Sequence, residues 1–241
     1  MWSGPRNIST AMMRSWGNRP DTFVCDEPLY AHYLVKSGRP HPGRDEVIAS
    51  QQNDWRRVVS WLAEFDPPGK RVFYQKQMTH HLLPEVERSW IDRVENAFLI
   101  RSPRAVIASF ARVIDRPALE DTGFPQQLEI FEEVRRRTGR TPPVVDAADV
   151  VADPAGTLRL LCEALGVAFT GAMLSWPAGP RMTDGVWAKH WYDAVVRSTS
   201  FERPESSDLR AEALPEHLAA LLPRAEEIYA QIHPHRLRAT H

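Results

Sequence analysis

The first sixteen residues of the chain predict a β-strand, a tight turn and a helix in direct succession. A short apolar opening leads into Gly4-Pro5, a polar loop follows, and apolar residues then recur at 8, 12, 13 and 16. Because backbone N–H groups and the positive end of a helix converge at such a loop, this unit suits a bound anion. Arg6 supplies a cation there, and Ser9 and Thr10 supply hydroxyl groups. The alternative is a capped first helix with an exposed arginine.

Strands and helices continue to alternate along the chain. Short buried strands are predicted at 22–25, 71–75, 96–100 and 143–146, and a long amphipathic helix at 45–65. This alternation indicates an α/β fold of three layers, with a central, mostly parallel sheet and helices on both faces. Ligands of such folds bind at the carboxyl ends of the strands. Since the opening loop begins at residue 4, the first strand is expected to be unusually short.

The chain of 241 residues is expected to form a single domain. Residues 176–204, rich in Trp, Gly and Pro, predict a loop-rich lid beside the site, and the apolar pattern of 209–232 predicts a closing helix. No stretch approaches the length of about 18 apolar residues that marks a membrane span, and no basic-then-apolar leader precedes the opening loop. We therefore expect a cytoplasmic protein with no membrane contact.

The charge and the cysteines of the chain limit the kinds of partner and ligand that are expected. With 30 basic and 31 acidic side chains, the formal charge is −1, so neither nucleic acid nor an anionic membrane is expected to bind. Cys25 and Cys162 fall in apolar patterns and are expected to be reduced core thiols. No Cys or His pairs lie at the spacing of a zinc site, so no metal is expected. Nothing in the sequence indicates an oligomer.

A second strand–helix unit follows the strand at 96–100. Arg101 ends this strand, and Pro103 marks a helix start because its missing N–H costs nothing at the first helical position. Ser109 lies about two turns into that helix. Arg101 and Ser109 are therefore expected near the edge of the sheet where ligands bind.

A third run, 146–166, predicts a strand end and a helix that Asp153-Pro154 begins and Gly166 ends. Together with 2–16 and 96–110 it resembles the sulfotransferase family, whose members bind 3′-phosphoadenosine-5′-phosphosulfate (PAPS) on a P-loop-like fold. The resemblance implies that the opening loop holds the 5′-phosphosulfate, through Arg6, Asn7, Ile8, Ser9 and Thr10. It implies that Arg101 and Ser109 hold the 3′-phosphate. The chain departs from the family at Asn7-Ile8, where Ser-Gly usually follows the cation.

Sulfonate transfer is an in-line displacement at sulfur that needs cations on the sulfonate oxygens and a base for the acceptor proton. Because the sulfonate carries one charge, Arg6 and Lys76 are candidates to replace a metal. Lys76 opens a segment that resembles the family's Lys-Thr-His-x-Pro-like turn. Glu27 is one candidate base, since the tyrosyl-protein and trehalose branches use a glutamate after the same strand. His80 is the other, and on a strand only one of His80 and His81 can face the sulfonate.

The late segment 181–191 resembles the mobile loop that closes on the 3′-phosphate in cytosolic sulfotransferases. The resemblance implies that Arg181 and Lys189 complete a charge clamp and that Trp187 closes the lid, with a plain surface loop as the alternative. Aromatic residues are candidates for an acceptor pocket, although such residues more often belong to a core. These candidates are Tyr30, Tyr33, Trp55, Trp176 and Trp191.

The resemblance thus implies a PAPS-dependent sulfotransferase that acts on a hydroxyl or amine of a small-molecule acceptor. One alternative is a kinase-like P-loop nucleotide enzyme. Against it stand the absence of Gly-Lys-Ser/Thr from the opening loop and the lack of a clear Mg-binding Asp at a strand end. The other alternative is a degenerate member of the family that binds an anion or a partner protein, because the opening loop has lost its glycine.

Overall fold

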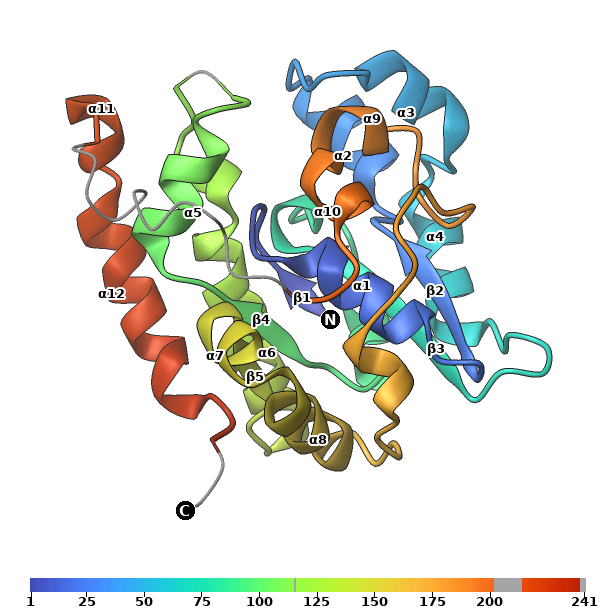
Figure 1. Ribbon diagram of the computed structural model, residues 1–241. Helices are drawn as coiled ribbons and strands as arrows, with labels where there is room; N and C mark the ends of the chain where they lie inside the picture. Colours follow the sequence, from blue (N-terminus) through green and yellow to red (C-terminus); the bar gives the residue numbers. More distant parts are fainter. Residues whose placement is uncertain (115, 202–213, 239–241) are drawn as a thin grey trace.

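A sheet of five parallel strands forms the middle layer of the molecule, with helices on both of its faces (Figure 1). The computed structural model describes residues 1–114, 116–201 and 214–238. Across the sheet the strands are ordered β2 (Thr22–Asp26), β3 (Val72–Met78), β1 (Trp2–Ser3), β4 (Phe98–Ile100) and β5 (Val144–Asp146). The prediction of a three-layer α/β fold is confirmed, and the short first strand is observed. All carboxyl ends meet at one edge of the sheet.

Most of the helices lie against the sheet or against one another. The longer ones are α1 (Ser9–Gly17), α2 (Tyr30–Ser37), α3 (Arg44–Ser50), α4 (Trp55–Glu64), α5 (Pro103–Phe110), α6 (Phe124–Thr138), α7 (Ala147–Ala152), α8 (Pro154–Ala164) and α12 (Leu222–Ile232). The short ones are α9 (Ala188–Trp191), α10 (Asp193–Arg197) and α11 (Glu216–Ala219). Short 3₁₀-helices are η1 (Thr79–His81), η2 (Ser89–Arg93), η3 (Glu120–Thr122), η4 (Gly171–Leu174) and η6 (His233–His235).

Side chains alternate along each strand and so divide the core between the two faces of the sheet. In β4, Phe98 and Ile100 pack with residues of α4, α5, α6 and α12, whereas Leu99 packs with residues of α1, α7 and α8. All three side chains are fully buried. Burial on both faces explains why this strand is a continuous apolar run, as is typical of parallel sheets with helices on each side.

Capping residues begin the helices where the sequence predicts them. Pro103 is the first residue of α5, and the Asp153 carboxylate accepts a hydrogen bond of 2.9 Å from the N–H of Gly156 at the start of α8. Gly166, just after α8, has a φ of 66°, a left-handed conformation that glycine adopts without steric penalty. These local signals mark the start of α5 directly after β4 and both ends of α8, which follows β5 and the short helix α7.

The prediction of a single long helix at 45–65 is wrong, because the structure has two shorter helices there. Helix α3 ends at Ser50, and α4 begins at Trp55 because Asp54 caps it by accepting a hydrogen bond of 3.1 Å from the N–H of Arg56. Between the two helices, Gln51 is extended and binds the backbone of Ala31 and Glu27. The helical spacing of apolar residues continues across this break because each of the two helices buries one face.

The C-terminal part of the chain returns over the sheet in two pieces. Residues of α9 and α10 lie above the carboxyl edge, where Trp187 and Tyr192 pack with Tyr30 and Tyr33 of α2. Helices α11 and α12 lie within the region of the predicted closing helix, and α12 runs beside α5 and α6 (Figure 1). Residues 202–204 of the predicted lid and 209–213 of the predicted helix lie outside the described residues.

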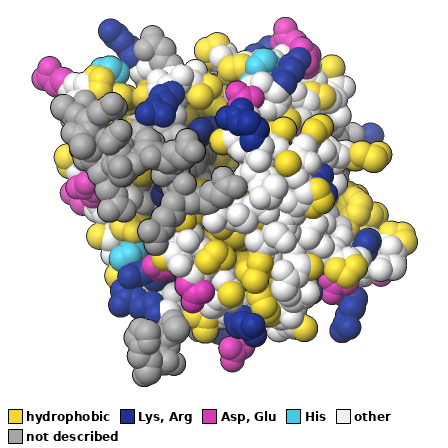
Figure 2. Space-filling model, in the orientation of Figure 1, with side chains coloured by type: hydrophobic (Ala, Val, Ile, Leu, Met, Phe, Trp, Pro, Cys, Tyr) yellow, Lys and Arg dark blue, Asp and Glu magenta, His cyan; other side chains and the backbone are white. Residues whose placement is uncertain are grey.

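Within the described ranges, no helix is both long and apolar enough to cross a membrane. On the face seen in Figure 2, acidic and basic side chains are interspersed over the described surface. This mixture agrees with the formal charge of −1.

Candidate active site

A cavity of about 560 Å³ opens at the carboxyl edge of the sheet. Its wall includes the opening loop, the residues that follow β2 and β4, the last part of β3, and the stretch from Trp191 to Ser200. Parallel α/β sheets bind ligands at this edge. Segments far apart in the sequence thus meet around one space.

The opening loop follows an uncommon backbone path. Arg6 has a φ of 61° and Ile8 a φ of 54°, in the left-handed region that favours glycine and is least suited to a β-branched residue. Ile8 precedes α1, and among the described residues no side chain caps this helix start. Residues Ser9, Thr10 and Ala11 of its first turn line the cavity. The free N–H groups and the helix dipole therefore offer an anion site.

Hydrogen bonds join the opening loop to Arg101, just before α5, and to Ser109, near the end of α5. Arg6 Nε donates to Ser109 Oγ at 2.9 Å, and Arg101 Nη1 donates to the Arg6 carbonyl at 2.5 Å. The two motifs that the sequence analysis linked to the 5′ and 3′ groups of a nucleotide are thus brought together. Asn7, between them, donates to the Leu99 carbonyl at 3.0 Å and is buried, so it anchors the loop to β4.

Positive charge gathers around this cavity. Its wall includes four arginines: Arg6, Arg101, Arg112 and Arg197. In the part of the chain that the structure describes, none of them forms an ion pair with a carboxylate. Burial, and then the neighbouring Arg112, lower the pKa of Arg6; burial, and then Arg6, lower the pKa of Arg101. Such mutual repulsion favours a bound anion.

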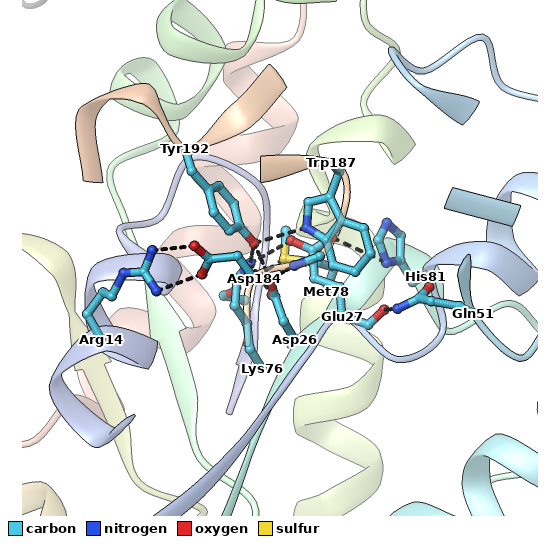
Figure 3. A network of polar contacts seen from close by, with 12 residues as sticks. Arg14, Asp26, Glu27, Gln51, Lys76, Met78, His81, Asp184, Trp187 and Tyr192 are labelled. Atoms are coloured by element: carbon cyan, nitrogen blue, oxygen red, sulfur yellow. Dashed lines mark hydrogen bonds and ion pairs between the residues drawn. The ribbon is translucent and has the colours of Figure 1, made fainter. Parts of the chain in front are cut away.

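Beside the arginines lies a buried polar network centred on Lys76 (Figure 3). The Lys76 ammonium donates to Asp26 Oδ1 at 2.9 Å, to Glu27 Oε1 at 2.6 Å and to the Tyr192 hydroxyl at 2.6 Å. The Tyr192 hydroxyl in turn donates to Asp26 Oδ2 at 2.7 Å and accepts from Trp187 Nε1 at 3.0 Å. Residues from β2, β3 and the C-terminal stretch therefore form one connected group.

Lys76 is more enclosed than its expected place after a strand implies. Strand β3 continues to Met78, Lys76 pairs in register with Asp26, and its side chain is 1% exposed. Burial lowers the pKa of Lys76, but the carboxylates of Asp26 and Glu27 outweigh it and hold the pKa well above its usual value. An ammonium group has three donors, and these three contacts use all of them.

Glu27 lies where the network meets the cavity. Its φ of 45° is left-handed, and the turn is held by its N–H, which donates to the Lys76 carbonyl at 3.0 Å. Gln51 Nε2 donates to the Glu27 carbonyl at 3.1 Å. Burial raises the pKa of Glu27 and Asp26 adds to the effect, while Lys76 offsets part of it. Glu27 is therefore a stronger base than an exposed glutamate.

The two adjacent histidines do not lie on a strand. They belong to the 3₁₀ turn η1, both are buried, and both line the cavity, so the expectation that only one can face it is wrong. Burial, and then His41, lower the pKa of His80 to about 3, and burial lowers that of His81 well below its usual value. Burial thus disfavours a proton on either imidazole, whereas it favours one on Glu27.

Aromatic rings surround the Glu27 side of the cavity. Tyr30 and Trp191 line it together with His41, and the Tyr30 hydroxyl lies 2.8 Å from His41 Nδ1. The Tyr30 ring also stacks on His81 with a centroid distance of 4.5 Å. Tyr33, Trp55 and Trp176, the other aromatic candidates of the sequence analysis, are not part of the wall.

The expected clamp residues of the late segment do not reach the cavity wall. Lys189 is half exposed and pairs with Glu46 at 2.6 Å, and Arg181 donates to the Pro177 carbonyl. The segment is instead held by Asp184, which forms a buried, two-bond ion pair with Arg14 of α1 at 2.6 and 2.7 Å. Arg181 and Lys189 both bond to groups outside the cavity wall.

Sequence reasoning missed four groups that the fold brings to this region: Arg112, Arg197, Asp26 and Tyr192. None belongs to a recognisable local motif, and Asp26 is simply the last residue of a strand. The described residues include no group of three or more His, Cys, Asp or Glu side chains placed to hold a metal ion.

A profile of the sulfotransferase domain matches residues 1–231 of the chain. Two curated relatives from Arabidopsis thaliana match over 204 residues: Branched-chain-amino-acid aminotransferase-like protein 1 at 36% identity, and protein 2 of that name at 33%. Each match covers 85% of this chain and 36% of the relative. The chain therefore spans about a third of the length of these relatives.

Solved structures share the fold. The sulfotransferase domain of the Synechococcus PCC 7002 olefin synthase has a TM-score of 0.55 at 21% identity, covering 95% of this chain and 92% of that one. The sulfotransferase domain from the curacin biosynthetic pathway has a TM-score of 0.55 at 16% identity, covering 96% and 95%. A sulfotransferase from Alicyclobacillus acidocaldarius has a TM-score of 0.54 at 14% identity, covering 99% and 96%.

Proposed function

Because the chain belongs to the sulfotransferase domain family, we propose that it transfers a sulfonate group from PAPS to a hydroxyl or amine of a small-molecule acceptor. The observation that carries the proposal is the presence of four arginines in the cavity wall that form no ion pair with a carboxylate among the described residues. PAPS carries a 3′-phosphate, a 5′-phosphate and a sulfonate. Guanidinium groups bind such oxyanions through paired, charge-assisted hydrogen bonds.

The donor is proposed to lie along the opening loop and the start of α5. The 5′-phosphosulfate takes the N–H groups at the start of α1, the hydroxyls of Ser9 and Thr10, and the Arg6 guanidinium. The 3′-phosphate takes Arg101 and Ser109, with Arg112 and Arg197 in place of the clamp first assigned to Arg181 and Lys189. No metal is required in this scheme, since protein cations neutralise the charge.

Transfer then proceeds by in-line displacement. The acceptor oxygen or nitrogen forms a bond to sulfur while the bond from sulfur to the 5′-phosphate oxygen breaks, and adenosine 3′,5′-bisphosphate leaves with that electron pair. Glu27 takes the acceptor proton, which its raised pKa favours. His80, whose pKa is lowered to about 3, contacts the acceptor in its neutral form instead. Lys76 holds Glu27 in place at 2.6 Å.

The acceptor is proposed to be uncharged. Around Glu27 the wall includes Tyr30, His41 and Trp191 together with the two neutral imidazoles of His80 and His81. Among the described residues, the cation that bonds to Glu27 is Lys76, and its donors are all taken. Such a surface packs against an apolar or aromatic body and offers single hydrogen bonds to a neutral group. A second anion beside the Glu27 carboxylate is disfavoured by charge. The two free cysteines support the cytoplasm as the place of action of this proposed single-domain enzyme.

Calorimetry separates this proposal from its alternatives. The protein is titrated with adenosine 3′,5′-bisphosphate and, separately, with ATP in the presence of Mg²⁺. We expect the bisphosphate to bind more tightly, because the arginines replace the metal. Preference for ATP with Mg²⁺ would instead support a kinase-like enzyme. Binding of neither would support a degenerate member of the family, in which the left-handed Ile8 has cost the loop its anion site.

A further inference from the structure

Two consecutive carboxylates share one buried ammonium in this site. Asp26 is the last residue of β2 and Glu27 follows it, and both accept hydrogen bonds from Lys76 Nζ. The side chains of Lys76, Asp26 and Glu27 are 1%, 2% and 11% exposed, so bulk water compensates their charges poorly. The mechanism above uses Glu27 and Lys76 but leaves Asp26 without a role.

The charge of this group changes during the proposed reaction. Before transfer, one ammonium and two carboxylates carry a total of −1. When Glu27 takes the acceptor proton, Lys76 and Asp26 remain as a neutral pair at 2.9 Å. If Asp26 were neutral, the same proton would leave Lys76 as a buried cation without a counter-charge. That state is strongly unfavourable, and Glu27 would resist the proton.

We propose that Asp26 is a positioning residue that acts through Lys76, keeping the ammonium compensated so that Glu27 is free to take up the acceptor proton. This inference rests on the proposed function of Glu27. The geometry supports it, because Asp26 turns its oxygens to Lys76 and Tyr192 and does not line the cavity, whereas Glu27 does. Asp26 therefore sets the basicity of the group without touching substrate.

Tyr192 fixes Asp26 from the other side. Its hydroxyl donates to Asp26 Oδ2 at 2.7 Å, and Trp187 Nε1 donates to the same hydroxyl at 3.0 Å. This hydrogen bond draws part of the Asp26 charge away from Glu27. Tyr192 thus influences the charge of Asp26 although the two residues are 166 positions apart in the sequence.

The pKa of Glu27 is the quantity to measure. The titratable groups that face Glu27 are Asp26 of β2, Lys76 of β3, His81 of η1, Tyr30 of α2 and Tyr192 after α9. Carboxyl ¹³C resonances of glutamate-labelled protein are followed by NMR as the pH changes, and the Glu27 signal is the one lost in Glu27→Gln. The titration needs neither donor nor acceptor.

In Asp26→Asn we expect the Glu27 midpoint to fall by roughly one unit or more, since a neighbouring negative charge is removed. Asp45→Asn is the matched control, because Asp45 is 91% exposed, and it leaves the midpoint in place. A Glu27 midpoint that is unchanged or raised in Asp26→Asn overturns the inference. Failure of the proposed function is read separately, from the nucleotide calorimetry.

Tyr192→Phe keeps the test decisive if Asp26→Asn does not fold. This variant retains the ring and removes the hydroxyl, which donates to Asp26 and accepts from Lys76 and Trp187. The charge on Asp26 then acts more strongly on Glu27, and the contact with Tyr192 that lowers the pKa of Glu27 is lost as well, so the midpoint rises. A midpoint that stays in place or falls in Tyr192→Phe contradicts the proposed coupling. The Glu27 midpoint is expected to shift in opposite directions in the two variants. A general loss of structure would not produce opposite shifts, so the pair of variants identifies an electrostatic role.

Discussion

Replacing Lys76 by methionine should destabilise the protein strongly at neutral pH. Methionine keeps most of the side-chain volume but removes the charge that two buried carboxylates share, Asp26 at 2.9 Å and Glu27 at 2.6 Å. Removing one partner of a buried ion pair leaves an uncompensated charge and lowers the free energy of unfolding by about 3–5 kcal/mol. For a chain of this size that corresponds to a fall in Tm of roughly 6–20 °C.

The loss in Lys76→Met should depend on pH in a defined direction. Lys76 offsets part of the rise in the pKa of Glu27, so without it this pKa rises further above the unfolded value of about 4.3. A raised folded pKa contributes stability below the unfolded pKa, and this contribution is lost as the pH rises through the folded pKa. The difference from the natural protein should therefore be largest at neutral pH and shrink toward pH 4, by up to about 1.4 kcal/mol per pH unit and proton.

The assay is urea unfolding of both proteins at several pH values between 4 and 8. Lys36→Met is the matched control, since Lys36 is exposed at the end of α2 and its loss should change stability by less than about 0.5 kcal/mol. The reasoning would be refuted if Lys76→Met were no less stable at pH 7 than Lys36→Met. A deficit that is equal at every pH would refute the assignment to carboxylates.

Two further predictions concern the base and the opening loop. Glu27→Gln should lower single-turnover sulfonation from saturating PAPS by roughly 10²–10⁴-fold with little change in donor affinity; a near-normal rate would shift the role to His80. Ile8→Gly should be more stable than Ile8→Ala by about 1 kcal/mol in urea unfolding, because both lose the same contacts and only glycine suits a φ of 54°. Equal stabilities would show that the loop bears no such strain.

Local signals were sufficient to predict the layers of this fold. Strands β4 and β5 are short apolar runs, and each is followed by a helix that begins with a proline or a capping aspartate, so the apolar pattern and the helix-start signals agree. The break between α3 and α4 was not visible, since both helices bury faces in the same period and Asp54 is one polar residue among several. Its cause is tertiary, because Gln51 leaves the helix to bind the backbone of Glu27.

The site was only partly predictable for a similar reason. Arg6 and Arg101 stand beside strands, where the fold dictates the position of a ligand, and the structure brings them into one cavity. Arg181 does not reach the cavity wall, and its segment is held to α1 by the ion pair between Asp184 and Arg14, which are 170 residues apart. A pair of residues so far apart in the sequence forms no local pattern that could be recognised. A strand followed by a charged residue does form such a pattern.

The most direct test of the proposed donor is the contribution of its 3′-phosphate to binding. Calorimetry compares adenosine 3′,5′-bisphosphate with adenosine 5′-monophosphate in the natural protein and in Arg101→Ala. Arg101 is partly buried at the cavity wall, and loss of a charge-assisted contact from it should weaken the bisphosphate by about 1.5–3 kcal/mol. The monophosphate should bind both proteins equally well. Equal losses for the two nucleotides in Arg101→Ala would contradict a 3′-phosphate site at Arg101, and with it the proposed donor.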